Sequence, residues 1–182
     1  MIAVHARYRG REKGRAEFVK SSARALSTLP GVSPFEIVGV EDIRATVNGP
    51  ETALNLIMAL LSDGNWAIGL GITRKRRAEF AATEAVGTRA AQVSVITDAT
   101  AAGTEAEDIS ATFALLAYIL HKRTFEGRQA TGLVRSGLNQ NEAAAELGIS
   151  KQAMSQRLQA AGWQAEQAGW KLALHLIRRA TQ

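Results

Sequence analysis

The chain contains no cysteine among its 182 residues. A disulfide framework, a thiolate metal site and a cysteine nucleophile are therefore excluded. The longest uninterrupted apolar run, FALLAYIL at 113–120, is far shorter than the roughly 20 residues that a helix needs to cross a bilayer. The first residues, MIAVHARYRGREKGR, include no apolar segment typical of a secretion signal. We expect no membrane contact and a cytoplasmic location.

Sequence motifs of common enzymes are also missing. We find no Gly-x-Ser-x-Gly elbow, Walker loop or zinc-ligand spacing. His5, His121 and His175 are far apart, so we interpret them as surface or hydrogen-bonded core histidines. Gly69 and Gly71 in IGLGI lack the third glycine of a dinucleotide fingerprint, and we expect them to allow close packing or a bulge. No catalytic residue, metal or cofactor is predicted.

The composition is that of a globular protein, with 46% hydrophobic and 21% charged residues. The length allows one medium domain or two small ones. The net charge of +5 permits DNA binding without requiring it. The distribution of charge along particular helices is therefore more informative than the total.

Residues 138–158, LNQNEAAAELGISKQAMSQRL, have the pattern of a helix-turn-helix. Asn139 and Glu142 can form a capping box at the start of the first helix. Gly148 is suited to the left-handed conformation that ends this helix, and Ser150 can cap the second. Met154 and Leu158, four residues apart, form the buried stripe of the second helix.

The opposite face of the second helix carries hydrogen-bond donors and no acid, since none occurs between Glu146 and Glu166. Such a face suits the major groove and the phosphates of DNA, where a carboxylate would be repelled. An ordinary helical hairpin with a solvated polar face is the alternative. The DNA-binding residues that we predict, in a helix-turn-helix at 138–161, are Gln140, Ser150, Lys151, Gln152, Ser155, Gln156 and Arg157.

Residues 1–100 have the pattern of a mixed α/β domain. Predicted strands at IAVHARY, FEIVGV, IRATV and WAIGLGI alternate with predicted helices at 12–29 and 51–61. This β-α-β-β-α-β order suits a ferredoxin-like or nucleotide-cyclase-like sheet. QVSVI at 92–96 can add a strand, and the Thr/Ala-rich stretch before it is not assigned.

The small, polar run at 97–108 marks the predicted boundary, and an all-α domain at 101–182 follows it. Ile109, Phe113, Leu116 and Leu120 form a helical stripe. Residues 125–136 are predicted as the first helix of a three-helix DNA-binding core. A last helix carries Trp163, Trp170, Leu174 and Ile177 on one side, which suits core or dimer packing, with a ligand surface as the alternative. The fold class predicted is α+β.

Residues 138–177 resemble the helix-turn-helix of the SatD family of bacterial proteins. The segment that carries the resemblance is NEAAAELGISKQAMSQRLQAAGWQAE. The resemblance implies an N-terminal domain like the nucleotide-cyclase/GGDEF palm. EDIRATVNGPETAL at 41–54 and IGLGI at 68–72 are similar to the corresponding parts of that domain. A cyclase palm needs carboxylates on adjacent strands for two Mg²⁺ ions. Here Glu41 and Asp42 could supply one cluster, but the first strand offers no acid, and we predict a catalytically silent scaffold.

Two basic segments allow two interpretations each. Residues 74–77, RKRR, could form a solvated loop or an arm that contacts nucleic acid. The alternating basic residues at 7–15 could bind an anionic ligand or backbone, or could protect an edge strand.

The sequence therefore predicts a dimeric transcriptional regulator, nucleoid-associated, that binds double-stranded DNA with the helix at 151–161. It identifies no small-molecule effector. One alternative is a cyclase-like Mg²⁺-dependent nucleotide enzyme that uses the helix-turn-helix for recruitment. The other is a protein-interaction module.

Overall fold

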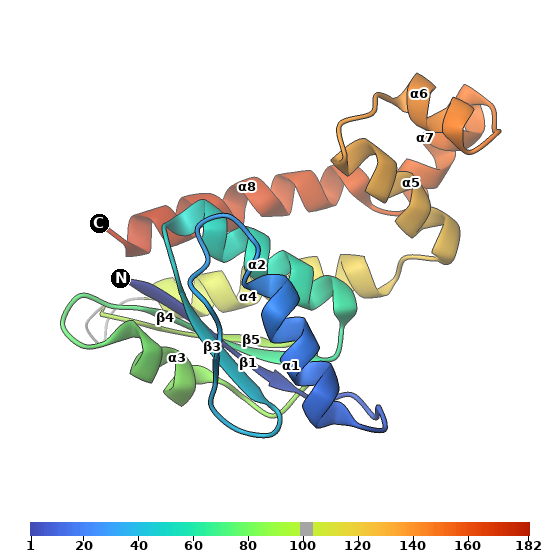
Figure 1. Ribbon diagram of the computed structural model, residues 1–182. Coiled ribbons are helices and arrows are strands. Elements are labelled where there is room, and N and C mark those ends of the chain that lie inside the picture. Colours follow the sequence, from blue (N-terminus) through green and yellow to red (C-terminus); the bar gives the residue numbers. More distant parts are fainter. Residues whose placement is uncertain (99–103) are drawn as a thin grey trace.

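The computed structural model describes residues 1–98 and 104–182, which form a five-stranded mixed sheet with helices on both faces (Figure 1). The chain is thus α+β. In chain order, its elements are β1 (Ile2–Tyr8), α1 (Arg15–Leu26), β2 (Glu36–Ile37), β3 (Asp42–Val47), α2 (Pro50–Asp63), β4 (Trp66–Ile72), α3 (Ala78–Ala85), β5 (Val93–Thr97), α4 (Glu105–His121), α5 (Phe125–Arg135), α6 (Gln140–Glu146), α7 (Lys151–Ala160) and α8 (Trp163–Ala180). The elements β1 to β4 follow the predicted β-α-β-β-α-β order.

The strands lie in the order β2-β3-β1-β4-β5. β1 pairs with both β3 and β4 in antiparallel fashion, and β5 runs parallel to β4 after the α3 crossover. Arg7 lies opposite Asp42 and His5 opposite Arg44 in the β1–β3 register. Because β1 is internal, the suggestion that its basic residues protect an edge strand is wrong.

Side chains of β1 alternate between two different environments, as the pleat of a strand requires. Val4 and Tyr8 enter the main core, whereas Ala3 packs against Ala78 and Ala82 of α3 on the other face. On β4 the α3 face consists of Ala67, Gly69 and Gly71, so the helix approaches closely. A Cβ atom on Gly69 would lie 2.1 Å from the Ala82 carbonyl oxygen. Of the two predictions for these glycines, close packing is the one observed.

The main core continues beyond the sheet into the helical half of the chain. Phe113 of α4 and Ile177 of α8 are fully buried in the same cluster as Val4 and Leu54. The predicted boundary at 97–108 falls partly outside the described residues. The core does not divide there, because α4 and the C-terminal part of α8 complete it.

Helices α5, α6 and α7 form a separate unit, here called the lobe (residues 125–160). Figure 1 shows it beyond one end of the sheet, joined to the rest by α4 and by the long helix α8. Its own small core contains Ala130, Ala143, Ala144, Met154 and Leu158, with Trp163 of α8 packed against it. α8 therefore has its first turn in the lobe and its last turns in the main core.

Three local predictions differ from the structure. FEIVGV forms only the two residues of β2, because the chain turns back and the Val38 and Gly39 N–H groups donate to the Asp42 carbonyl. The Thr/Ala-rich stretch before QVSVI, which the sequence did not assign, contains α3. The first helix begins at Arg15 and not at residue 12. In the part of the chain that the structure describes, no helix combines the length and apolar character needed to span a membrane.

Candidate nucleic-acid interface

The ends of α6 and α7 are set by local hydrogen bonds. Asn139 Oδ1 accepts from the backbone N–H groups of Asn141 and Glu142, at 2.9 and 3.1 Å. The Glu142 carboxylate accepts in return from the Asn139 N–H at 2.8 Å, which completes the predicted capping box. Gly148 ends the segment at a φ of +62°, and Ser150 Oγ accepts from the Ala153 N–H at 3.1 Å.

The inner faces of α6 and α7 pack on each other as the sequence predicted. Ala143 and Ala144 are buried, and small side chains allow the close approach of the two helices. Met154 and Leu158 of α7 fill the space between them. The orientation of α7 is thereby fixed, and its opposite side must face away from the lobe.

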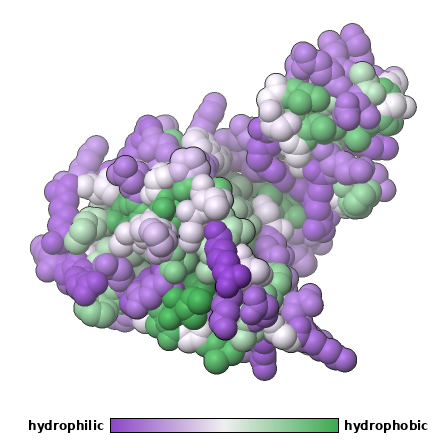
Figure 2. Space-filling view, in the orientation of Figure 1, coloured by the Kyte–Doolittle hydropathy of each residue, from purple (hydrophilic) through white to green (hydrophobic). Residues whose placement is uncertain are grey.

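The outer side of α7 is free of intramolecular partners. Lys151, Gln152, Ser155 and Gln156 are exposed, and within the described residues none forms a hydrogen bond or ion pair. Gln140 and Ser150 are exposed at the first turns of α6 and α7, where backbone N–H groups are directed outward. In Figure 2 the lobe presents hydrophilic residues interspersed with apolar ones.

Arg157 differs from the other predicted residues because it is half-buried. Its positive charge acts on Glu126 in the first turn of α5. The pKa of the Glu126 carboxyl lies below its ordinary value, chiefly because of hydrogen bonds from its own backbone N–H and from Thr124, with a smaller effect of Arg157. Arg157 therefore has one acidic neighbour inside the lobe, whereas Lys151 forms no ion pair with any described residue.

A buried ion cluster joins the lobe to α8. Glu166 of α8 is 2% exposed and accepts from the guanidinium groups of both Arg123 and Arg135, the latter at 2.6 Å. Arg123, which follows α4 and is 6% exposed, also donates through Nε to the Ala161 carbonyl at 2.8 Å. Sequence analysis missed this cluster, because nothing local in the chain indicates that residues 123 and 166 meet.

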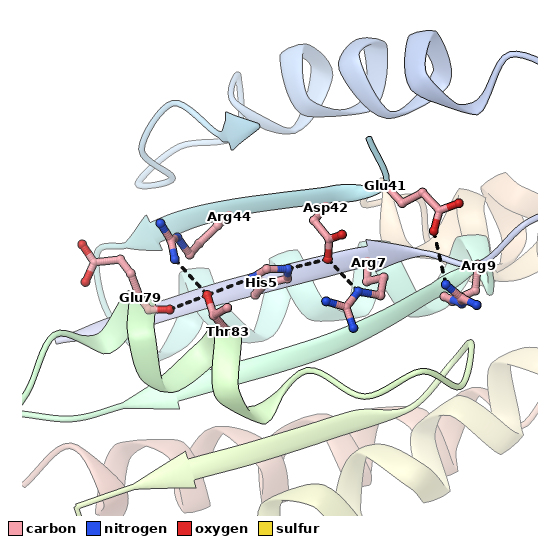
Figure 3. A network of polar contacts seen from close by, with 8 residues as sticks. All are labelled: His5, Arg7, Arg9, Glu41, Asp42, Arg44, Glu79 and Thr83. Carbon is pink, nitrogen blue, oxygen red and sulfur yellow. Dashed lines mark hydrogen bonds and ion pairs between the residues drawn. The ribbon is translucent and has the colours of Figure 1, made fainter. Parts of the chain in front are cut away.

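A second polar network lies between the sheet and α3 (Figure 3). His5, 1% exposed, contacts Asp42 Oδ1 through Nε2 at 2.8 Å and Thr83 Oγ1 through Nδ1 at 3.0 Å. Arg7 Nε donates to the same Asp42 oxygen at 2.7 Å, and Arg44 donates to Thr83 Oγ1 at 2.8 Å. The Thr83 hydroxyl also reaches the Glu79 carbonyl at 2.9 Å.

This network resembles a hydroxyl–imidazole–carboxylate relay in its connectivity, but its hydroxyl is held by the protein. Burial lowers the pKa of His5 more than Asp42 raises it, so the imidazole is neutral and Nε2–H donates to Asp42. Burial raises the pKa of Asp42, yet hydrogen bonds from His5 and Arg7 outweigh it and keep the pKa below its ordinary value. With Nε2–H donated to Asp42, Nδ1 of His5 can only accept, so the single hydroxyl proton of Thr83 is shared between His5 Nδ1 and the Glu79 carbonyl, while Arg44 donates to Oγ1. The hydroxyl is thus held by protein groups, and the arrangement is that of a structural network.

The two carboxylates considered for a metal are each engaged by cations. Asp42 contacts His5 and Arg7, and Glu41 pairs with Arg9 at 3.2 Å and with Arg15 at 2.5 Å. Across residues 1–98 and 104–182, no group of three or more histidine, aspartate or glutamate side chains could hold a metal ion. These pairs also account for several of the alternating basic residues near the N-terminus.

The basic run at 74–77 lies in the loop between β4 and α3. Arg76 pairs with Glu84 at 2.7 Å and Arg77 with Glu79 at 3.3 Å. The backbone N–H groups that precede them donate to Asp98. These pairings fit the solvated-loop interpretation better than a free arm.

Comparison of the chain with protein-family models, with curated protein sequences and with solved structures gave no match. The resemblance to the SatD family therefore stays a prediction. The function must be argued from the geometry of the molecule itself.

Proposed function

We propose that the protein is a sequence-specific DNA-binding protein, a bacterial-type transcriptional regulator acting at the nucleoid, that places α7 in the major groove. The exposed outer face of α7 is the observation that carries the proposal. Four neighbouring donor side chains there have no partner within the described chain, although α7 is capped and firmly packed on its inner side.

Each side chain has a role that its chemistry supports. Gln152, Ser155 and Gln156 can hydrogen-bond base edges, since amide and hydroxyl groups both donate and accept. Lys151 and Arg157 neutralise phosphates or contact guanine. Gln140 and Ser150 hold phosphates at the N-terminal turns of α6 and α7, where the helix dipole favours an anion.

We further propose that the sheet unit, which comprises β1 to β5 with α1 to α3, is a ferredoxin-like scaffold of the cyclase-palm type, as the SatD resemblance implies. The strand order β2-β3-β1-β4, with β1 antiparallel to both neighbours, supports this topology. The cyclase-like enzyme is the weaker candidate, because Asp42 is paired with Arg7, and Glu41 with Arg9 and Arg15. A protein-interaction module would not require the acid-free face of α7.

The DNA-binding form is proposed to be a homodimer. One recognition helix buries a modest area, and affinity generally needs two helices on a two-fold site. Leu115 and Tyr118 of α4 are large apolar residues that remain 67% and 65% exposed. They provide a surface that a second copy of the chain can cover.

A salt titration distinguishes DNA binding from the other two functions. Anisotropy of a labelled random-sequence duplex is measured between about 50 and 200 mM salt, where phosphate contacts make affinity fall steeply. Lys151→Gln should weaken binding and reduce the slope of log affinity against log salt by about 1. Lys20→Gln on α1, which removes the same charge from an exposed site on the sheet unit, should change neither. Absence of binding at low salt, or equal losses in both variants, contradicts the proposal.

A further inference from the structure

A cavity of about 670 Å³ lies where α2, α5 and α8 meet, between the sheet unit and the lobe. Its volume is that of a site for a small organic molecule. Met58 and Asn55 of α2 form one wall, Val134 and Arg135 of α5 another, and Trp163 and Trp170 of α8 the third.

The tryptophans give the cavity an aromatic surface. Of the three in the chain, Trp66 is 2% exposed in the main core, whereas Trp163 and Trp170 are half-buried and both line the cavity. The Arg135 guanidinium already lies over the Trp163 ring, 5.5 Å from its centroid, so a flat ring can contact only the remaining exposed surface of Trp163 together with Trp170. Met58 and Val134 add further apolar surface.

Arg135 and Glu166 both line the cavity, and Arg123, outside the lining, adds a second positive charge to this pair. Two guanidinium groups, of Arg123 and Arg135, share the single carboxylate of Glu166, whose two oxygens are both engaged. Arg123 is buried, but the side chain of Arg135 is 49% exposed and lines the cavity. Arg135 donates one N–H to Glu166 and retains others, and the guanidinium fork is suited to a carboxylate. Asn55 and Gln167 place amide groups at the same opening.

We propose that this cavity binds a small aromatic carboxylate, with its ring against Trp163 and Trp170 and its carboxylate on Arg135. Because the walls come from the sheet unit and from the lobe, the bound molecule holds the two in one relative position. Ligand binding is independent of the proposed DNA contact, since the cavity lies away from α7. It is therefore tested without DNA.

The experiment uses the full chain labelled with ¹⁵N and follows its three indole N–H signals, assigned with single Trp→Phe variants. The probe is 2-naphthoate. We expect saturable shifts of the Trp163 and Trp170 signals and an unchanged Trp66 signal. Neutral 2-naphthamide and non-aromatic cyclohexanecarboxylate should each bind at least about tenfold more weakly.

Two variants locate the carboxylate. Arg135→Gln should weaken 2-naphthoate binding at least about tenfold, and Arg135→Lys, which keeps the charge, should bind more tightly than Arg135→Gln. Lys171→Gln removes a charge from the exposed side of α8 outside the cavity and should have no effect. An unshifted Trp66 signal shows that each variant is folded. The proposal is overturned by no saturable shift at millimolar 2-naphthoate, by equal binding of the amide, or by equal losses in the Arg135→Gln and Lys171→Gln variants.

Discussion

Replacing Glu166 by glutamine tests how strongly the buried ion cluster holds the lobe. The substitution preserves shape and removes the one carboxylate that pairs with Arg123 among residues 1–98 and 104–182; the Arg123 side chain is 3% exposed. Leaving a buried guanidinium without its anion costs about 3 to 5 kcal/mol. Arg135 is half-exposed and can be solvated by water, so most of this cost arises at Arg123. A loss of this size is a large fraction of the stability of a typical domain.

Native-state amide hydrogen exchange is the appropriate assay, because the lobe has its own small core and can open separately. Amides of α5, α6 and α7 should exchange faster in Glu166→Gln, while those of β1 and β4 keep their protection. Glu84→Gln, which breaks the exposed pair with Arg76, should change stability by no more than about 0.5 kcal/mol. The double variant Arg123→Met/Glu166→Leu should recover much of the loss. A loss below about 1 kcal/mol in Glu166→Gln would refute the reasoning.

Three further predictions concern the sheet unit and the oligomer. Burial holds the pKa of His5 in the folded protein below its ordinary value of about 6.5. As the pH falls below that value, the unfolded chain therefore binds more protons than the folded protein, and the free energy of unfolding should decrease. His5→Gln should lose this part of the decrease between about pH 6.5 and 5 in urea titrations; an identical slope would show that His5 is not responsible. Gly69→Ala should destabilise by about 1 to 3 kcal/mol or more because its Cβ meets the α3 backbone, whereas Gly132→Ala, in open space within α5, should stabilise by about 0.5 to 1 kcal/mol. In thermal unfolding, Gly69→Ala should lower the melting temperature and Gly132→Ala should raise it; shifts of the same sign would contradict this prediction. The proposed homodimer should be seen in sedimentation of the wild type and should become monomeric in Leu115→Glu/Tyr118→Glu; a monomeric wild type or an unchanged dimer would contradict the proposed interface.

Features set by short stretches of chain could be predicted from the sequence. The capping box of Asn139 and Glu142 is an example, because both partners lie within one helical turn. The left-handed conformation of Gly148 and the buried stripe of Met154 and Leu158 are others. For the same reason β4, with its continuous apolar run, was predicted with its observed limits.

Features that depend on distant parts of the chain could not be predicted. α3 is short and rich in alanine, and its packing depends on the bare surface that Gly69 and Gly71 present on β4. The meeting of Arg123 with Glu166 depends on how α8 returns past the lobe. The cavity between α2, α5 and α8 arises from the same return, and its residues are scattered over more than 100 positions.

The central claim is that the outer face of α7 distinguishes DNA sequences. Selection from a random duplex library tests this most directly, with wild type and the Gln152→Ala/Gln156→Ala variant compared at one salt concentration. The account predicts that the wild type enriches a defined site. The variant should lose about 1 to 3 kcal/mol of discrimination for each amide removed, while its affinity for random DNA is preserved. An identical enriched site for both proteins, or no enrichment by the wild type, would contradict the account.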